Sequence, residues 1–585
     1  MLTGLIGRML EGRKPAVASI VLLQLVQAAA SLMLPTVNAS IIDDGIVAGN
    51  PAVISRLGLL MASAAALQAA AAIAAGYLAA VVSMRIGHRL RAQMFARILA
   101  LSSQDIAAFG TQSLTTRATN DVQQVQAFAV LAFTMLVAGP AMGVGGIVMA
   151  LQQDAALSAV VIAIVPVLML VMYRIVRRLV PLYREGQELL DRAGGILREQ
   201  IIGAQTIRAF VRQDHEIRRF GRTNNSLTAN NQQSALLVAG MLPLMMLVVN
   251  LSSVAIVWFG GHLIQSRQMN IGALAAFISY ILQILIAIMM SMYVLMTAPR
   301  AAVSAERIEA VLVAAPSVRE APLRVRDRPS GEAARPSSAG LLEFHGVGFS
   351  YPGAEVPVLA DISFTAVPGT ITAIVGATGS GKSTLLNLVP RFLDSTRGRI
   401  TLGGTDIREQ PLEALRASMS LVPQHAHLFT GTIAENLRMA APRATDRELW
   451  EALETAQTMR FMTRLPHGLE TPVGQGGATL SGGQRQRLCI ARALLHPAPL
   501  FLFDDSFSAL DYDTDARLRD ALGVALAAAT TVVVAERISA VRNADRIMVL
   551  DDGRLVAQGT HLELLEESQA YRQIAESQLA LGSEP

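Results

Sequence analysis

Long uncharged apolar stretches alternate with arginine-rich stretches over residues 1–300 of the chain. A helix that spans a membrane needs about 20 predominantly apolar residues in succession. Six stretches meet this requirement, and they lie near residues 17–34, 57–84, 127–151, 155–173, 234–260 and 271–298. The pattern therefore predicts an all-α membrane domain of six transmembrane helices within residues 1–314.

The segments that join these stretches differ in charge. The first, third and fifth are short and poor in arginine, whereas the second carries five arginines from Arg85 to Arg117 and the fourth carries eleven from Arg174 to Arg222. Arginine-rich loops stay on the cytoplasmic side of a membrane. We therefore expect a multi-pass protein of the cytoplasmic (inner) membrane, with both termini and the C-terminal domain in the cytoplasm.

Both arginine-rich segments keep a helical periodicity well beyond the thickness of a bilayer. They are expected to leave the membrane as long helical rods, which reverse near Thr115–Val122 and near Phe210–Phe220. The reversals are candidate contacts with a second domain, and the alternative is a solvated helical face.

Charge is absent from the cores of the predicted spans. A charge buried in a span commonly marks an ion or proton path, so this pattern argues against one. The net charge of the whole chain is only +4, which gives no indication of nucleic-acid binding.

The second half of the chain has a different composition. Residues 315–340 are rich in Pro, Ser, Ala and Arg without apolar periodicity, which predicts a linker. Residues 341–585 read as a soluble α/β domain. The 585-residue chain is 52% hydrophobic and 16% charged, which is too apolar for an ordinary soluble protein and long enough for two or more domains.

A glycine-rich loop dominates the chemistry of the second domain, because it fits the phosphate-loop pattern G-x-x-x-x-G-K-[ST]. It follows the strand-like run Ile371–Val375 and leads into the helical pattern Leu385–Val389. Its glycines allow backbone N–H groups to surround a polyphosphate, and the helix N-terminus adds a favourable dipole. The loop consists of Gly376, Ala377, Thr378, Gly379, Ser380, Gly381, Lys382, Ser383 and Thr384.

Two residues of this loop have specific expected roles. Lys382 should reach the β- and γ-phosphates of a nucleotide, and the Ser383 hydroxyl should ligate Mg²⁺. Of the 49 Lys and Arg residues only Lys14 and Lys382 are lysines. A chain this poor in lysine still places one where a compact point charge suits a phosphate better than a planar guanidinium.

Further motifs accompany the phosphate loop. Tyr351 closes the strand upstream and is a candidate to stack on adenine, while Gln424 follows an apolar run. Asp504 ends a buried strand, where phosphate-loop enzymes hold Mg²⁺. A second helix start with N–H groups free for a phosphate has the sequence LSGGQ. It comprises Leu480, Ser481, Gly482, Gly483 and Gln484.

With these motifs the chain resembles a half-transporter of the ATP-binding cassette (ABC) exporter family over nearly its whole length. The resemblance implies ATP-driven export, with ATP and Mg²⁺ as cofactors, and the uncharged span cores suggest that the transported molecule is apolar or amphipathic. It also implies that two nucleotide domains close head to tail around two ATP molecules, each site pairing one phosphate loop with the partner's LSGGQ signature. By the same resemblance Tyr351 stacks on adenine, Gln424 lies between Mg²⁺ and the membrane half, Asp504 is the Mg²⁺-side acid, and Ser508–Asp511 crosses to the partner.

The sequence departs from the family pattern at two positions beside the phosphate loop. The family usually has Glu after the Mg²⁺-side acid, as the base that polarises water, and this chain has Asp505. The family usually has a His that donates to the γ-phosphate, and here the matching residue is Glu536, which cannot donate when ionised. Asp505, Glu536 and Gln424 are the candidate catalytic residues, and a smaller departure is Gln475 in place of Glu.

These departures predict a degenerate site that binds ATP and hydrolyses it poorly. Because the signature at Ser481–Gln484 is intact, we expect a heterodimer with a non-identical half-transporter that carries the usual Glu and His. The alternatives are a homodimeric exporter and a regulatory or channel-like membrane protein that ATP gates without being consumed.

Overall fold

The computed structural model describes residues 2–12, 14–318 and 339–581. Contacts within the chain divide it into two compact units, unit 1 with Met1–Leu99 and Gly110–Ala314, and unit 2 with Ala100–Phe109 and Ala315–Pro585. Residues Ala100–Phe109, which fall inside the predicted membrane domain, thus belong to unit 2. The predicted linker lies largely outside the described residues, so its bounds stay a prediction.

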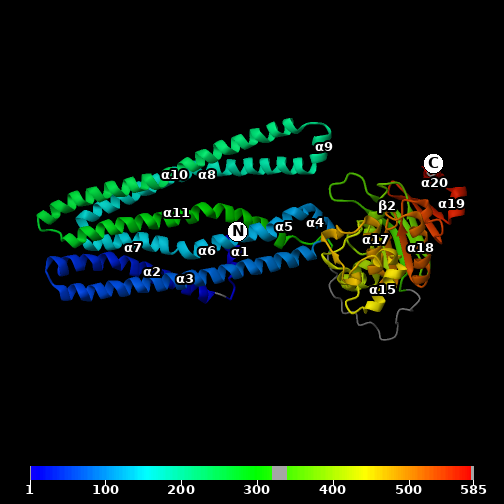
Figure 1. Ribbon diagram of the computed structural model, residues 1–585, viewed down its shortest axis with the longest axis horizontal. Helices are drawn as coiled ribbons and strands as arrows, with labels where there is room; N and C mark the ends of the chain where they lie inside the picture. The colour runs from blue at the N-terminus through cyan, green and yellow to red at the C-terminus, as the bar shows by residue number, and fades with distance from the viewer. Residues whose placement is uncertain (1, 13, 319–338, 582–585) are drawn as a thin grey trace. The chain divides into compact units, whose positions relative to one another are not determined.

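Unit 1 is built of helices, and the prediction of six apolar membrane helices is confirmed. By length and composition the helical segments that can cross a membrane are Lys14–Val47, Pro51–Ala100, Thr111–Gln153, Leu157–Ile202, Gln213–Gln265 and Ile271–Val313. The elements of unit 1 are α1 (Leu2–Met9), α2 (Lys14–Ser40), the π-helix η1 (Ile41–Val47), α3 (Pro51–Ala100), α5 (Thr111–Thr116), the π-helix η2 (Arg117–Asp121), α6 (Val122–Met135), α7 (Ala138–Gln153), α8 (Ala155–Ile202), α9 (Ala204–Ala209), α10 (Gln213–Gln265) and α11 (Ile271–Val313) (Figure 1).

The first rod reverses earlier than expected, so the predicted reversal near Thr115–Val122 is wrong. The chain turns between α3 and α5 through the short helix α4 (Ser103–Phe109), and residues 115–122 already belong to the returning helix. At the start of α4 the Ser102 backbone donates to Asp105 Oδ2 at 3.0 Å and the Asp105 backbone donates to Ser102 Oγ at 3.1 Å. This reciprocal cap, followed by Gly110 at a φ of 79°, ends one rod and starts the next.

The second rod reverses between Gly203 and Arg212. Helix α8 ends at Ile202, the short helix α9 follows, and Val211 with a φ of 53° precedes α10. The reversal was expected near Phe210–Phe220. It therefore shares only residues 210–212 with the observed turn, and the rest of the predicted range belongs to α10.

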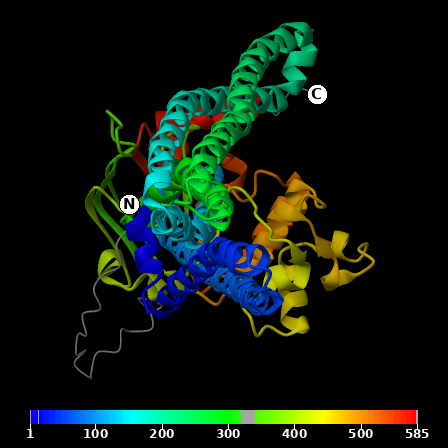
Figure 2. The same ribbon diagram turned by 90° about the vertical axis from the view of Figure 1, so that its left-hand side faces the viewer.

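Helix α11 is the most buried of the apolar helices and packs on α7, α6 and α2. Helices α7 and α11 approach closely at Gly139, where a Cβ atom would lie 2.7 Å from Ser291 Oγ. Small residues permit such contacts between membrane helices. Helices α8 and α10 lie side by side and diverge from the other helices of the unit (Figures 1 and 2).

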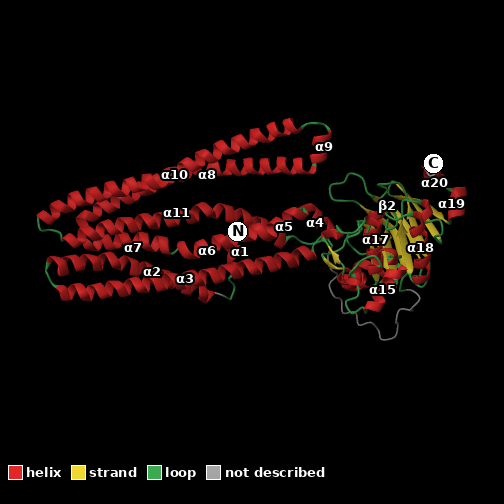
Figure 3. Cartoon of the chain, in the orientation of Figure 1, coloured by secondary structure: helices red, strands yellow, loops and turns green. Residues whose placement is uncertain are grey.

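Unit 2 contains two main sheets (Figure 3). The six-stranded sheet has the order β12-β11-β3-β10-β9-β6, and all its pairs are parallel except β12 with β11. Its strands are β3 (Ile371–Val375), β6 (Met419–Val422), β9 (Leu500–Asp504), β10 (Thr530–Val534), β11 (Arg546–Asp551) and β12 (Arg554–Gly559). The antiparallel sheet β2-β1-β4-β5 and the pair β7-β8 consist of β1 (Leu342–Phe349), β2 (Leu359–Ala366), β4 (Arg397–Leu402), β5 (Thr405–Asp406), β7 (Gly431–Thr432) and β8 (Pro472–Val473).

The helices of unit 2 are α4, α12 (Lys382–Leu388), α13 (Leu412–Ala417), α14 (Ile433–Arg438), α15 (Asp446–Thr455), α16 (Met459–Met462), α17 (Gly482–Leu494), α18 (Tyr512–Ala525), α19 (His561–Glu567) and α20 (Gln569–Leu581). The expected α/β architecture of this half is therefore present. Strand β10 lies between β3 and β9, and all three run parallel. Because the carboxyl ends of parallel strands meet at one edge of a sheet, the loops after these three strands converge on one site.

Candidate functional site

The phosphate loop connects β3 to α12, and the surroundings admit only glycine at its first position. A Cβ atom on Gly376 would lie 2.1 Å from the carbonyl oxygen of Leu550 in β11. Gly381 has a φ of 100°, in the left-handed region that favours glycine. The glycine spacing read from the sequence thus has a steric cause in the fold.

Lys382 begins α12 and is buried. Its Nζ donates to the carbonyl oxygens of Gly376 and Ala377, both at 2.8 Å, so the ammonium lies within the loop. Burial lowers the pKa of this ammonium, and three nearby carboxylates oppose that shift. They belong to Glu536, Asp505 and Asp504.

Ser383 and Asp504 lie together although 121 positions separate them in sequence. The Ser383 hydroxyl donates to Asp504 Oδ1 at 2.9 Å, and burial raises the pKa of Asp504 against that hydrogen bond. A hydroxyl with a carboxylate suits Mg²⁺, which takes one or two protein ligands and completes its shell with phosphates and water. Within the described residues no group of three or more His, Cys, Asp and Glu side chains could hold a metal ion.

Asp505 follows β9 in a left-handed conformation with a φ of 44°. Its backbone N–H donates to Val534 in β10 at 2.9 Å, which holds the residue at the junction of the two strands. Burial raises the pKa of its half-buried carboxyl, and the charge of Glu536 raises it further, against a hydrogen bond from Ser508. Asp505 is therefore in an acidic environment beside the phosphate loop.

Glu536 faces the phosphate loop. The Thr378 hydroxyl donates to Glu536 Oε1 at 3.2 Å, and the Glu536 charge acts on both Lys382 and Asp505. The loop after β10 thus brings a carboxylate to the place where the resemblance to ABC exporters implies a hydrogen-bond donor.

Tyr351 and Gln424 lie at the edges of this site. The Tyr351 hydroxyl is 3.4 Å from Thr384 Oγ1, its ring meets Phe349 edge-on with centroids 4.8 Å apart, and it is 40% exposed. Gln424 is exposed in the loop after β6. The end of β6, just before that loop, is tied to the segment that follows β9, because the buried Ser506 hydroxyl donates to the Val422 carbonyl at 3.1 Å.

The LSGGQ turn lies elsewhere in the unit. Ser481 caps α17 through a reciprocal pair with Gln484, whose backbone donates to Ser481 Oγ at 3.3 Å. Helix α17 packs on α14, α15 and β6, whereas α12 packs on β9 and β10. In the described part of the chain no hydrogen bond or ion pair joins Ser481–Gln484 to the phosphate loop. Gly483 instead lies against Ala509, because a Cβ atom on Gly483 would be 3.0 Å from the Ala509 carbonyl oxygen.

A residue that the sequence did not indicate is Gln578 in α20. Its Nε2 donates to the Glu536 carbonyl at 2.7 Å, and its Oε1 accepts from the Ile538 backbone at 2.8 Å. The side chain thereby fixes the backbone on both sides of Arg537, whose guanidinium donates to Ser508 at 3.2 Å. About 40 positions separate the partners in sequence, so no local pattern could have found this clamp.

Loss of the clamp has a measurable expected result. We expect Gln578→Ala to speed amide hydrogen exchange at Ile538 by about two- to tenfold, because one net hydrogen bond of about 0.5–1.5 kcal/mol is removed. Gln573→Ala on the exposed part of the same helix is the control and should leave that amide unchanged. Equal exchange in both variants would show that Gln578 does not hold the loop.

Comparisons with known proteins agree with this arrangement. The family model for the ABC transporter transmembrane region matches residues 17–289, and the ABC transporter model matches residues 359–508. An uncharacterized ABC transporter ATP-binding protein of Mycobacterium tuberculosis is 43% identical over 99% of this chain and 98% of its own length. An ATP-dependent lipid A-core flippase of Chromobacterium violaceum is 33% identical, over 91% of this chain and 90% of its own. The solved structure of a bacterial Atm1-family ABC exporter with ATP bound covers 97% of this chain and 98% of its own, with a TM-score of 0.80 at 24% identity, so it shows a shared fold.

Proposed function

The chain belongs to the ABC transporter family, and on that premise we propose that it is one subunit of an asymmetric exporter, which holds ATP at its own phosphate loop and hydrolyses it slowly there. It is a multi-pass membrane protein with an ATPase domain, and exporters of this family work as dimers that couple ATP hydrolysis to transport.

One observation carries the proposal, namely that Glu536 faces the phosphate loop, where the Thr378 hydroxyl donates to its Oε1 at 3.2 Å, while Asp505 stands where the family usually has Glu. An ionised Glu536 beside Thr378 repels a γ-phosphate, and two unit charges at 4 Å and an effective dielectric constant of 20 interact by about 4 kcal/mol. The Asp505 carboxyl is one methylene shorter than the usual Glu, and a misplacement of roughly 1 Å can lower a rate about a hundredfold. Both changes weaken hydrolysis while the phosphate loop itself stays intact.

The intact turn at Ser481–Gln484 supports a second part of the proposal. In the closed dimer it completes the site on the partner's phosphate loop, and the partner is a different ABC half-transporter with the usual Glu and His. The separation of this turn from the chain's own phosphate loop supports pairing between chains.

The remaining site residues follow from the same geometry. Ser383 and Asp504 hold Mg²⁺, with the Gln424 amide oxygen as a further ligand, and Tyr351 stacks on adenine. Lys382 and the backbone N–H groups of Gly376–Thr384 hold the phosphates. The nucleotide domain lies on the cytoplasmic side of the cytoplasmic (inner) membrane.

The transported molecule is apolar or amphipathic. The predicted span cores are uncharged, and the relative from Chromobacterium violaceum is named as a lipid A-core flippase, which supports a lipid-like molecule moved by export.

The test compares the full-length chain alone with the complex that contains its partner. We expect the vanadate-sensitive ATPase rate of the complex to exceed that of the chain alone by roughly tenfold or more, because the fast site lies on the partner's phosphate loop. Full activity of the chain alone as a dimer would contradict the degenerate site. Flux against a gradient in proteoliposomes separates export from an ATP-gated channel, which can only dissipate a gradient.

A further inference from the structure

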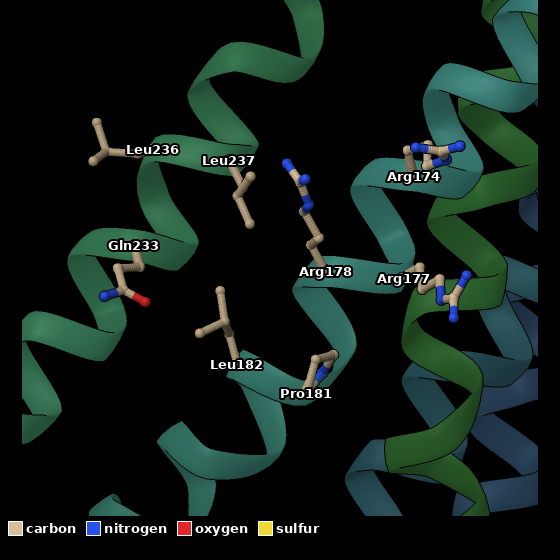
Figure 4. A pocket seen from close by; sticks show the side chains of 8 residues that line it. All are labelled: Arg174, Arg177, Arg178, Pro181, Leu182, Gln233, Leu236 and Leu237. Atoms are coloured by element: carbon tan, nitrogen blue, oxygen red, sulfur yellow. The ribbon is translucent and has the colours of Figure 1, made fainter.

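A cavity of about 790 Å³ lies between α8 and α10 in unit 1, far in sequence from the nucleotide site. Side chains from both helices line it, and three of them are arginines (Figure 4). The lining residues are Arg174, Arg177, Arg178, Pro181, Leu182, Gln233, Leu236 and Leu237.

The span boundaries predicted from the sequence place the cavity at the depth of lipid headgroups. Helix α8 is uncharged from Ala155 to Tyr173, which at about 1.5 Å per residue spans roughly 28 Å, close to the thickness of a bilayer core. The arginines begin at the next residue. On α10 the polar run that follows Arg222 ends at Gln233, and the predicted apolar span of residues 234–260 starts directly after it. Both helices thus cross the interface at the cavity, on the side of the membrane that carries the arginine-rich segments.

The charge in this cavity is not compensated by the residues around it. No Asp or Glu lines it, the first acid on α8 is Glu185, and α10 has none after Glu216. Over residues 2–12, 14–318 and 339–581 none of the three guanidinium groups of the cavity makes an ion pair or hydrogen bond with another residue. The side chain of Arg178 extends into the space between the helices, beside Leu237 (Figure 4).

Unsatisfied polar atoms lie on the adjoining turn of α10. Asn230 Oδ1 and Ser234 Oγ are buried without a hydrogen-bond partner among the described residues. Asn230 faces α8, because a Cβ atom on Gly186 would lie 2.9 Å from its Oδ1. Buried polar atoms without partners are rare, and an unassigned ligand or water is one explanation for them.

We propose that this cavity binds an anionic amphiphile from the adjacent leaflet. The phosphate or carboxylate headgroup pairs with Arg178 in the field of Arg174 and Arg177, since arginine suits the planar pairing of such anions. The acyl chain lies along Leu182, Leu236 and Leu237. This site is separate from the nucleotide site and does not depend on which chain hydrolyses ATP.

The experiment measures binding to the full-length chain in nonionic detergent by native mass spectrometry. The probes are dioctanoyl phosphatidic acid, dioctanoyl phosphatidylcholine and inorganic phosphate. We expect Arg178→Gln to weaken the binding of phosphatidic acid about tenfold, because it removes one charge-assisted hydrogen-bonding group. Arg218→Gln is the matched control, since it removes an equal charge from an exposed part of α10 and should leave binding within about twofold of wild type.

Each other outcome counts against the site. Equal losses in Arg178→Gln and Arg218→Gln would reduce the interaction to general attraction by positive charge. If phosphatidylcholine bound as tightly as phosphatidic acid, the site would not recognise an anionic headgroup and the proposal would be wrong. Displacement of phosphatidic acid by inorganic phosphate at the same concentration would identify a free phosphate site, in which the leucines have no role.

Discussion

Replacing Ser481 with aspartate is expected to lower the ATPase rate of the complex by roughly a hundredfold or more, whereas replacing Lys382 with alanine leaves a substantial part of that rate. In the proposed dimer Ser481 faces the γ-phosphate on the partner's phosphate loop. A carboxylate there repels the phosphate by about 4 kcal/mol at 4 Å and an effective dielectric constant of 20. Each 1.36 kcal/mol added to the barrier lowers the rate tenfold.

Aspartate is chosen because it changes the charge of the LSGGQ signature without removing the N-cap of the helix that follows. Ser481 caps α17, and removal of an N-cap typically costs about 1 kcal/mol of stability. Aspartate caps helices as well as serine does, so Ser481→Asp keeps the helix and changes only the charge. Thr445→Asp is the matched control, because Thr445 caps α15 through the same reciprocal pair with Glu448. The control should keep the wild-type rate and thermal stability.

Lys382→Ala acts on the chain's own site. There it leaves three carboxylates without their cation and weakens ATP binding, but the fast hydrolysis takes place at the partner's phosphate loop. The measurement is steady-state ATP hydrolysis by the complex at saturating ATP. If Lys382→Ala abolished hydrolysis and Ser481→Asp spared it, the assignment of the fast and slow sites would be reversed.

The phosphate loop was accessible to sequence reasoning because its residues are contiguous and its steric demands are local. Gly376 and Gly381 sit where the fold leaves no room for a side chain or requires a left-handed backbone. The contact of Ser383 with Asp504 also followed from the motifs, since each ends or begins an element at the same edge of a parallel sheet.

The turns between the helical rods were harder to place, because helical periodicity continues through both of them. The first turn lies at residues 101–110 and has a local sequence signal in the Ser102–Asp105 cap and in Gly110. The helical periodicity around it led to a prediction further along the chain, near Thr115–Val122. The Gln578 clamp has no such signal, since an amide can satisfy backbone groups anywhere. The direction of the Glu536 side chain toward the phosphate loop could not be predicted either, because the residue type alone does not determine where the carboxylate points.

The second large effect is a gain of activity. We expect the double substitution Asp505→Glu with Glu536→His to raise hydrolysis at the chain's own phosphate loop by up to about a hundredfold. The longer carboxylate reaches the position of the usual base, and a histidine beside Thr378 supplies a donor in place of a repelling charge.

This gain is measured in the Ser481→Asp background, where hydrolysis at the partner's loop is suppressed and only the chain's own site remains. The control is Asp505→Asn with Glu536→Gln, which removes the negative charge at both positions and supplies no base, whereas the Glu and His variant keeps the carboxylate at position 505. Glutamate tolerates the left-handed φ of 44° at position 505 less well than aspartate, so the thermal stability of each variant is measured alongside.

The two double variants separate the two reasons for slow hydrolysis. If repulsion of the phosphate is the main obstacle, the Asn and Gln variant binds ATP more tightly but still hydrolyses it slowly, because no carboxylate activates water. If the missing base is the main obstacle, the Asn and Gln variant binds ATP no more tightly than its parent, and only the Glu and His variant gains rate. A folded Glu and His variant that stays as slow as its parent would contradict the proposal, because the slow step would then lie outside the two carboxylates that act on Lys382.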